Sequence, residues 1–501
     1  MTNSRLRLLA ERAFKWSALT TAGRFVLQLV AQVLLARLLG PDNYGVYGIG
    51  MVVLTFAAFL SGNAFSYSLM LRKELTREDI RFAFTWQALA GIGCGLGMYL
   101  LAAPLATFFA DPRVEPMVHW LSVACVLAAL AGPSTSLLQR DLNFRALGLI
   151  QMAGYAAGYL AVGVPMALTG HGPQALAAAC VVQAVVTLAA SYAVRPHSLR
   201  PLLRHGSGGA DTMDTGRTVF FTNLTNWLLA NLDRLVIGRV LNAQSVGLYS
   251  VAYNIASIPY VLLINSLQPA FLAAGARLQD QPGQLAQAWK TMLACVVVFV
   301  VPASIVMALL AGDLVQVLYG DAWSEAGWLM AVMFLCLPAW ACLGLSTPVL
   351  WNTGRKRLEV WLQLPVLALA VPAWWLIAPS GVRSVAIVSA IVIVLRAVVV
   401  VVAGMRAVQL EGRTVLLLLA RGVALGALFG LTVEVARLAA AASFHSPLLT
   451  LLLGSGVALL VAAALVGGRP QLLGREAGEV LSRFIPSLGH RWSPTVPEPR
   501  P

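Results

Sequence analysis

Charged residues are scarce in this chain: Asp, Glu, Lys and Arg together make up 11% of its 501 residues. A typical soluble domain carries about a quarter. Hydrophobic residues reach 59%, and the mean hydropathy is +0.78. Because there is too little charge to cover a soluble surface, the composition excludes a soluble globular protein. It indicates a chain that lies largely in lipid.

Motifs for metal, nucleotide and sugar-transfer chemistry are also missing. The six cysteines form no Cys-x-x-Cys pair and the six histidines are scattered, so we expect neither a disulfide framework nor a metal site. The sequence lacks the Gly-x-x-x-x-Gly-Lys-Ser/Thr loop that cradles ATP phosphates. No outward connection offers the paired carboxylates of sugar transfer. We therefore expect no catalytic residue and no cofactor, and any transport must be driven by a gradient, by the membrane potential or by consumption of the substrate on the far side.

Apolar segments long enough to cross a bilayer fill most of the chain. A helix needs roughly 20 apolar residues to cross about 30 Å of hydrocarbon. About fourteen such spans are predicted, at 17–38, 46–69, 82–107, 116–138, 146–169, 174–194, 218–241, 247–271, 289–311, 326–351, 358–378, 384–404, 415–437 and 447–466. Pro133 and Pro338 predict breaks in the fourth and the tenth span. The predicted fold class is an all-α polytopic membrane protein.

Half of the chain repeats the other half. The tract 37–47 returns as 239–249, a shift of 202 positions, and in both tracts an apolar helix ends in Arg-x-Leu, breaks over a polar turn and restarts at Gly-x-Tyr. Two further correspondences are 109–111 with 319–321 and 138–145 with 350–357. An internally duplicated polytopic chain with its binding site between the repeats is typical of secondary transporters. The duplication therefore makes transport the starting hypothesis.

The repeats predict the domain organisation. Each repeat holds six spans, an even number, so both copies cross the membrane in the same direction. We expect an N-lobe at 1–200, a C-lobe at 201–410, an appended helix pair at 411–470 and a basic cytoplasmic tail at 471–501. The composition of the linker at 195–217, rich in Gly and Pro, predicts a flexible loop.

Basic residues recur on alternate connections, and this gives the orientation. Lys and Arg are frequent before the first span and after the even-numbered spans, whereas the opposite connections carry few of them. By the positive-inside rule both termini are predicted to be cytoplasmic. This placement also explains the net charge of +14, so no nucleic-acid partner is expected. Residues 1–15 lead directly into the first span, so no cleaved signal peptide is expected.

Small residues spaced by four predict close helix packing. They are Gly91, Gly93, Gly95 and Gly97 in the third span, Gly154 and Gly158 in the fifth, and Gly422, Gly426 and Gly430 in the thirteenth. Such spacing lets two backbones approach closely in lipid. Packing within the chain is the favoured interpretation, ahead of an oligomer interface.

Polar side chains inside the first span are the first candidates for function. Arg24, Gln28 and Gln32 are four residues apart and share one helical face. A charge at mid-membrane costs at least about 2.5 kcal/mol unless it faces protein or water. Because Arg24 has no acidic residue in its own helix, it is predicted to face a wet cavity or an anion. Arg396 in the twelfth span is a second candidate of the same kind.

The seventh span carries the corresponding polar face. Asn226 and Asp233 are seven residues apart on one face, and Arg234 lies at its flank. The shift of 202 places Arg24 on Asn226 and Gln32 on Arg234, so both faces are predicted to point into a shared cavity. An alternative stays open, in which Asp233 and Arg234 form a structural pair that satisfies itself.

Four tracts resemble one family of membrane proteins. They are 36–47, 71–76, 138–145 and 231–239. Through these tracts the chain resembles the Wzx-type polysaccharide flippases, in the lipopolysaccharide biosynthesis protein group of the multidrug/oligosaccharidyl-lipid/polysaccharide exporter superfamily. The similarity covers roughly residues 15–400.

The resemblance implies a function and its setting. It implies alternating access between two lobes, in a bacterial inner membrane, moving an undecaprenyl-diphosphate-linked oligosaccharide from the cytoplasmic to the periplasmic leaflet for exopolysaccharide or O-antigen synthesis. Arg24 and Arg396 would supply cations for the diphosphate. Membrane lipids are the implied surroundings, and a polysaccharide polymerase and chain-length machinery are candidate partners.

Two other classes of function remain open from the sequence. A drug or metabolite antiporter of the same superfamily would bind a cationic substrate in an acidic cavity, whereas the intramembrane residues here are weighted toward Arg. A membrane polysaccharide polymerase or ligase would be an enzyme, and would be expected to carry a long periplasmic loop.

Overall fold

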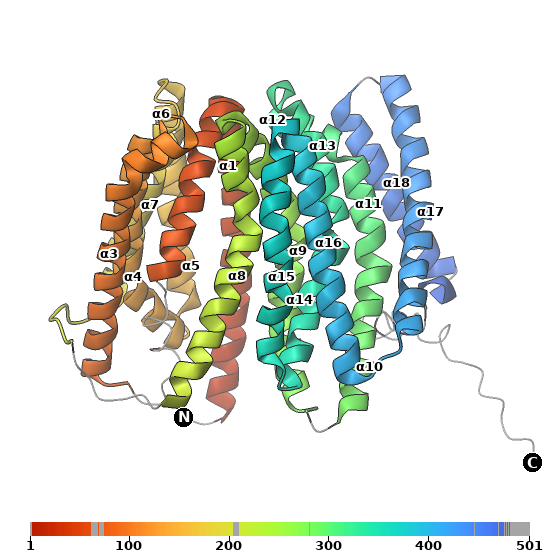
Figure 1. Ribbon diagram of the computed structural model, residues 1–501, viewed down its shortest axis with the longest axis horizontal. Coiled ribbons are helices and arrows are strands. Elements are labelled where there is room, and N and C mark those ends of the chain that lie inside the picture. Colours follow the sequence, from red (N-terminus) through yellow and green to blue (C-terminus); the bar gives the residue numbers. More distant parts are fainter. Residues whose placement is uncertain are drawn as a thin grey trace, which may run out of the picture. The chain divides into compact units, whose positions relative to one another are not determined.

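The structure is a computed structural model that describes residues 3–61, 69, 75–203, 210–279, 281–444, 446–468, 470–474, 476, 478 and 480. These residues form helices joined by short turns (Figure 1). The predicted all-α membrane fold is confirmed.

The first two predicted spans form the single helix α1 (Asn3–Ser61). Most of the other spans appear as one long helix each: α3 (Arg77–Phe109), α4 (Val114–Arg140), α7 (Gln174–Val194), α8 (Ala210–Val240), α9 (Ala243–Ala276), α15 (Lys356–Ile377), α16 (Val382–Val408), α17 (Gly412–Phe444) and α18 (Pro447–Gly468). Three spans are divided, into α5 (Phe144–Tyr155), η1 (Ala156–Gly163) and α6 (Val164–Leu168), into α10 (Pro282–Cys295), η2 (Val296–Val300) and α11 (Val301–Leu309), and into α13 (Ser324–Leu335) and α14 (Leu337–Asn352). The short helix α12 (Ala311–Tyr319) precedes α13.

The number of spans agrees with the prediction at the level of an approximate count. Among the described residues, 12 helices are long and apolar enough to cross a membrane. One of them, Thr20–Ser61, covers two predicted spans in 42 residues. Helix α8 carries Asp233 and Arg234 and is not among the 12. Counting both halves of α1 and adding α8 gives about fourteen.

The break inside α1 is produced by Gly40 and Pro41. Gly40 has φ 72° and ψ 171°, a backbone conformation open to glycine and strained for other residues. Pro41 follows and cannot donate a backbone hydrogen bond to the preceding turn. The predicted turn between the first two spans is therefore confirmed as a sharp kink.

The two prolines that predicted broken spans behave differently. Pro338 stands at the start of α14, directly after α13 ends, so that break is confirmed. Pro133 lies inside α4, which continues without interruption to Arg140, so the predicted break in the fourth span is wrong. Neighbouring groups in a bundle can satisfy the carbonyl that a proline frees, which is why prolines are tolerated in membrane helices.

The prediction of a loop at 195–217 is confirmed for residues 196–203, which form no helix, and is wrong for residues 210–217. Helix α8 already begins at Ala210. The segment before it is held against α3: the backbone nitrogen of Leu202 donates to Thr85 Oγ1 at 2.9 Å, and Trp86 Nε1 donates to the carbonyl of Leu203 at 3.3 Å. Composition alone could not reveal hydrogen-bond partners supplied by another helix. The run His205–Gly209 lies outside the described residues.

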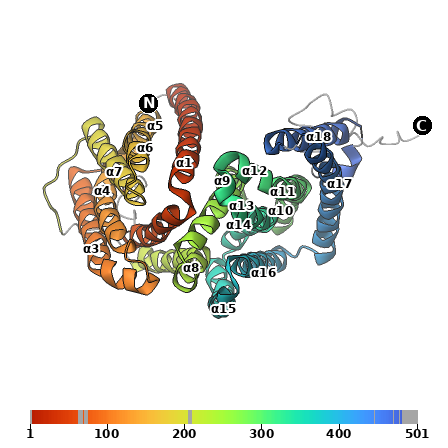
Figure 2. The same cartoon turned by 90° about the horizontal axis from the view of Figure 1, so that it is seen from above.

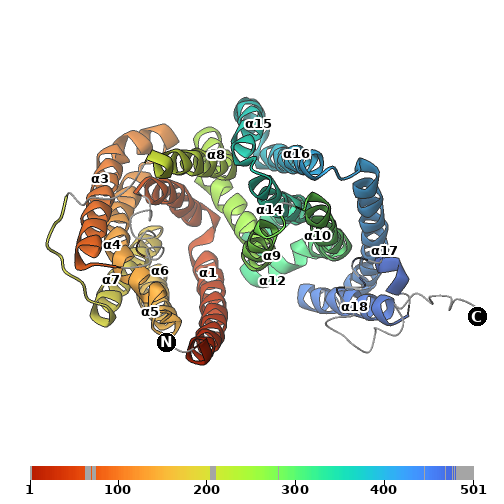
Figure 3. The same ribbon diagram turned by 90° about the horizontal axis from the view of Figure 1, so that it is seen from below.

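The chain divides into two compact units. Unit 1 comprises residues 1–214 and 234–250, and unit 2 comprises residues 215–233 and 251–501, so that the division runs through α8. Within unit 1, α4 packs against both α3 and α7 (Figure 2). Within unit 2, α14 packs against α16 and α10, and α17 packs against α18 (Figure 3). The predicted boundaries at 200 and 410 remain a prediction.

The glycine spacings mark helix contacts within the chain. A Cβ added to Gly91 or Gly95 in α3 would overlap side chains of α4, whereas Gly93 has nothing within 4 Å. In α17, Gly422 and Gly426 lie in the same way against η2 and α11. The predicted close packing of these helices is confirmed, because each contact requires a residue without a side chain.

Candidate functional site

The two duplicated turns meet within unit 1, each through its glycine. A Cβ on Gly45 in α1 would overlap the carbonyl oxygen of Ala243, and a Cβ on Gly247 in α9 would overlap the carbonyl oxygen of Pro41. The shift of 202 relates Gly45 to Gly247 and Pro41 to Ala243. The contact is therefore reciprocal, and the backbones of α1 and α9 approach as closely as glycine permits.

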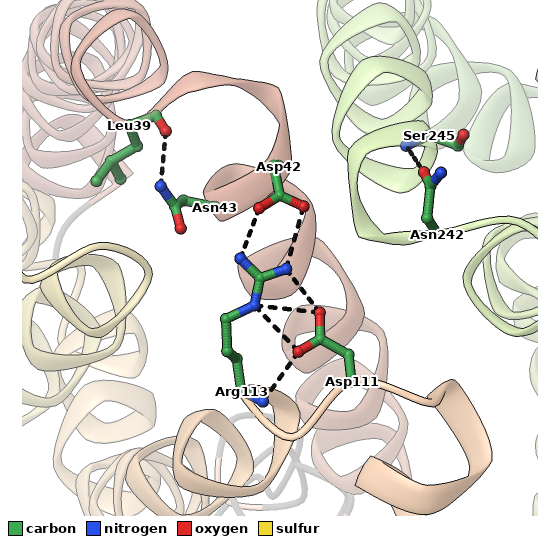
Figure 4. Close-up of polar contacts among 7 residues, drawn as sticks. All are labelled: Leu39, Asp42, Asn43, Asp111, Arg113, Asn242 and Ser245. Atoms are coloured by element: carbon green, nitrogen blue, oxygen red, sulfur yellow. Dashed lines mark hydrogen bonds and ion pairs between the residues drawn. The ribbon is translucent and has the colours of Figure 1, made fainter.

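A cluster of three charged side chains fastens the first turn (Figure 4). Arg113 donates to Asp42 from both terminal nitrogens, and its Nη2 donates to Asp111 Oδ2 at 2.8 Å. Burial by itself would raise the pKa of Asp111, but hydrogen bonds from Arg113 and its charge outweigh burial and lower that pKa from its usual 3.8. The same contacts raise the pKa of Arg113. These contacts therefore favour the charged forms of Asp111 and Arg113.

The turns are capped differently in the two copies (Figure 4). In the first, Asn43 Nδ2 donates to the carbonyl of Leu39 at 3.0 Å. In the second, Asn242 Oδ1 accepts from the backbone nitrogen of Ser245 at 2.8 Å and so caps the start of α9. Asn242 stands where the first copy has Gly40, so the second turn begins a helix without the positive φ of the first.

Each unit holds an Arg–Gln pair whose glutamine is duplicated. Arg24 Nη1 donates to Gln151 Oε1 at 2.7 Å in unit 1, and Arg396 Nε donates to Gln363 Oε1 at 2.8 Å in unit 2. The shift of 212 that relates 138–145 to 350–357 also relates Gln151 to Gln363. The arginine is not duplicated, because it comes from α1 in one unit and from α16 in the other.

The three polar residues predicted on one face of α1, Arg24, Gln28 and Gln32, do not form one connected hydrogen-bond network. Arg24 is half-buried and its hydrogen-bond partner is a neutral amide, so that bond does not neutralise its charge. Gln32 Nε2 donates to the hydroxyl of Tyr44 at 3.1 Å, and Gln28 is exposed. The three side chains are on one face, as predicted, but each has its own surroundings.

A polar cavity of about 570 Å³ lies within unit 2, among α8, α9, α14, α15 and α16. Of the predicted site residues, it brings together Asn226 and Arg396. Arg396 is only 7% exposed, and its Nη2 donates to Asn226 Oδ1 at 2.8 Å. Asn226 is the repeat equivalent of Arg24. In unit 1 this position supplies the arginine of the Arg–Gln pair, and in unit 2 it supplies an acceptor for the arginine of that pair.

Glu359 is a cavity residue that the sequence did not predict. It lines the same cavity as Arg396, is 3% exposed, and its Oε2 accepts from Trp351 Nε1 at 2.8 Å. It follows the basic run Arg355–Arg357 closely in the sequence and was not among the predicted site residues. The available signal was its spacing of four from Gln363, which puts both side chains on one face of α15.

Asp233 is separate from the cavity. It is 4% exposed, and its Oδ2 accepts from Ser389 Oγ at 3.2 Å, while Ser389 Oγ accepts from Trp374 Nε1 at 3.0 Å. Arg234, the next residue, is half-buried and belongs to unit 1. The roles of Asp233 and Arg234 in substrate binding remain a prediction.

We expect Asp233→Asn to preserve stability and Asp233→Leu to lose it. An amide oxygen can still accept the hydrogen bond from Ser389, whereas leucine leaves a buried hydroxyl without its acceptor, at a cost of about 1–3 kcal/mol. The measurement is thermal unfolding of the purified variants. Equal destabilisation by Asn and Leu would show that the negative charge itself is required.

Two solved structures of membrane proteins share this fold. The chain is similar to the lipid II flippase MurJ in an inward closed conformation, with a TM-score of 0.68 and 13% identity over 90% of this chain and 98% of that one. It is also similar to an inward-facing multidrug resistance MATE family transporter of the MOP superfamily, with a TM-score of 0.61 and 14% identity over 77% and 94% of the two chains. These matches show that the chain shares the fold of these two membrane proteins.

The family follows from the sequence comparison. The profile described as polysaccharide biosynthesis protein matches residues 34–327, more than half of the chain, and the chain belongs to this family. It is 26% identical to the lipopolysaccharide biosynthesis protein WzxC of Escherichia coli K12, over 62% of this chain and 63% of WzxC, less than two thirds of that relative. It is 25% identical to the succinoglycan biosynthesis transport protein ExoT of Rhizobium meliloti, over 69% and 70%. The predicted family is confirmed.

Proposed function

We propose that this protein flips a lipid-linked oligosaccharide from the cytoplasmic to the periplasmic leaflet of a bacterial inner membrane. The cargo is an undecaprenyl-diphosphate-linked repeat unit for exopolysaccharide or O-antigen synthesis, carried by alternating access between the two halves of the chain. The observation that carries the proposal is Arg396, a buried cation on the wall of a 570 Å³ polar cavity made by membrane-spanning helices. An ionisable side chain inside a membrane-spanning helix marks a candidate functional site.

The chemistry of such a cargo matches the side chains that are present. A diphosphate needs cations, and guanidinium groups grip phosphate oxygens through paired hydrogen bonds. Arg24 and Arg396 are the guanidinium groups proposed for it. A polyprenyl tail needs an apolar surface, and unit 2 has an apolar groove of about 400 Å³ between η2, α11, α17 and α18, with Phe299 and Phe429 on its walls.

The energy source need not be a motor on this chain. Moving a negative charge outward follows an inside-negative membrane potential and gains about 2.3 kcal/mol per charge per 100 mV. Removal of the cargo by a polymerase on the far side would pull the same step forward.

Export of a cationic drug is the competing proposal, and Glu359 is the observation in its favour. The carboxylate lies in the cavity, but Arg396 lines the same cavity and balances its charge. A site for a cation would be expected to hold an excess of negative charge. The lipid-linked anion is therefore the better fit.

We expect both termini and the linker at 195–217 to lie in the cytoplasm, because basic residues recur on these connections. Alkaline phosphatase fused after Gly209 or in the tail should be inactive, and a fusion at Asp321, on an opposite connection, should be active. Phosphatase activity from either of the first two positions would contradict the fourteen-span topology.

The proposed function is tested by deleting the gene. Lipid-linked repeat units should accumulate on the cytoplasmic leaflet while the enzymes that build them remain active. Surface polysaccharide should disappear. Unchanged polymer output from the deletion strain, where that strain has no second flippase, would contradict the proposed function.

A further inference from the structure

The two repeats hold equivalent cavities that differ in what lines them. Unit 1 has a cavity of about 400 Å³ among α1, α4 and α7, with walls that include Ala58, Ala128, Gly132 and Thr135. The cavity of unit 2 is lined at the equivalent positions by Tyr260, Trp340, Gly344 and Thr347. The shift of 202 relates Ala58 to Tyr260, and the shift of 212 relates the other three pairs.

At these equivalent positions, aromatic rings are found in the second repeat and not in the first. Tyr260 stands where unit 1 has Ala58, and Trp340 where it has Ala128. The ring centroids of Trp340 and Tyr260 are 5.8 Å apart, and those of Trp340 and Tyr253 are 5.5 Å apart at 77°. The unit 1 cavity is lined by no aromatic or charged residue among the described side chains. Helix packing alone does not require the aromatic rings, since α1, α4 and α7 pack around the smaller cavity without them.

The polar groups beside the rings offer both donors and acceptors. Gln268 Nε2 is fixed by the carbonyl of Gly344 at 2.9 Å, which leaves Gln268 Oε1 as an acceptor. Gln363 Oε1 accepts from Arg396, which leaves Gln363 Nε2 as a donor. Each amide is therefore held in one orientation by a hydrogen bond at one end. A preorganised set of this kind recognises a ligand that itself both donates and accepts.

We propose that the unit 2 cavity binds the pyranose ring of the cargo that is attached to the diphosphate. The slightly positive C–H bonds on one face of a pyranose pack on the negative face of an aromatic ring, and its hydroxyls pair with amides. Tyr260, backed by Trp340, is the aromatic surface, and Gln268 and Gln363 are the hydroxyl partners. Because Arg396 lines the same cavity, the sugar next to the phosphates is the one that fits.

This inference rests on the proposed function and names the part of the cargo that the cavity selects. It makes unit 2 the half of the protein that distinguishes one glycan from another. The variants that test it restore the residue of the first repeat, Tyr260→Ala and Trp340→Ala. Trp340→Phe keeps an aromatic face, and Trp361→Ala removes a tryptophan that is 69% exposed on α15 and lines neither cavity.

The experiment measures binding of two probes to the purified full-length protein in nanodiscs. One probe is undecaprenyl diphosphate, and the other is undecaprenyl diphosphate carrying a single hexose. We expect Tyr260→Ala and Trp340→Ala to weaken binding of the hexose probe about tenfold, as for a central contact residue, and to leave the sugar-free probe unchanged. Trp340→Phe should recover most of the loss, and Trp361→Ala should bind both probes normally.

The outcomes separate the inference from the function on which it rests. Equal loss for both probes, or no loss for either in both alanine variants, would overturn the sugar site while leaving the flippase in place. Failure of the wild-type protein to bind either probe would overturn the proposed function itself. Because Tyr260 is half-buried, Tyr260→Ala keeps the test valid if Trp340→Ala does not fold.

Discussion

Arg24→Ala is expected to abolish surface polysaccharide while the protein still inserts at its normal level. The guanidinium donates to the neutral side chain of Gln151 at 2.7 Å, and that bond leaves its charge available for an anion. Arg24→Lys should keep partial export, because an ammonium attracts phosphate as a point charge but cannot pair with two oxygens at once. The measurement is surface polymer together with the lipid-linked precursor in a complemented deletion strain.

The control for Arg24 is an arginine outside the proposed machinery. Arg383 is 58% exposed and pairs with Glu325 at 3.3 Å at the start of α16, so Arg383→Ala should export normally. Gln151→Ala should lower export less than Arg24→Ala, since it frees the guanidinium without removing it. Normal polymer output from Arg24→Ala would take Arg24 out of the mechanism and leave Arg396 as the cation.

Gly247→Ala and Gly45→Ala are expected to destabilise this conformation strongly. The added Cβ would meet a backbone carbonyl, of Pro41 in one case and of Ala243 in the other, and neither carbonyl can rotate away as a side chain would. Overpacking of this kind typically costs about 1–3 kcal/mol. Because the two contacts are reciprocal, either substitution should separate α1 from α9 and reduce export.

The measurement for the glycines is thermal unfolding of the purified variants, with export assayed in parallel. Gly93→Ala is the matched control, since this helical glycine has nothing within 4 Å of an added Cβ. The control should match the wild type or exceed it slightly, because alanine favours helix. Wild-type stability and export from Gly247→Ala would show that the close approach of the two turns has no role.

The sequence predicted the elements that depend on local chemistry or on the repeat. The kink at Gly40 and Pro41 follows from the two residues least compatible with a continuous helix. The Gly91 and Gly95 contacts follow from their spacing on one helix face. The duplication made the two turns equivalent, but only the structure shows that Gly45 lies against the carbonyl of Ala243 and Gly247 against the carbonyl of Pro41.

The parts that the sequence missed depend on contacts between distant segments. The segment before α8 looked flexible because the hydrogen bonds that hold it involve Thr85 and Trp86, more than 100 positions away. Glu359 was missed because its burial and its contact with Trp351 of α14 have no local signature in the sequence. The cluster of Arg396 with Gln363 and Asn226 joins three helices, with the first bond spanning 33 positions and the second 170.

The measurement that tests the central claim most directly uses the purified protein in liposomes that hold undecaprenyl-diphosphate-linked oligosaccharide in both leaflets. An impermeant glycosidase added outside cleaves the outer half in protein-free vesicles and spares the inner half. With the protein present, we predict that the protected half becomes accessible, and that Arg396→Ala restores protection. Equal protection with and without the wild-type protein, in vesicles shown to contain it folded, would contradict the account.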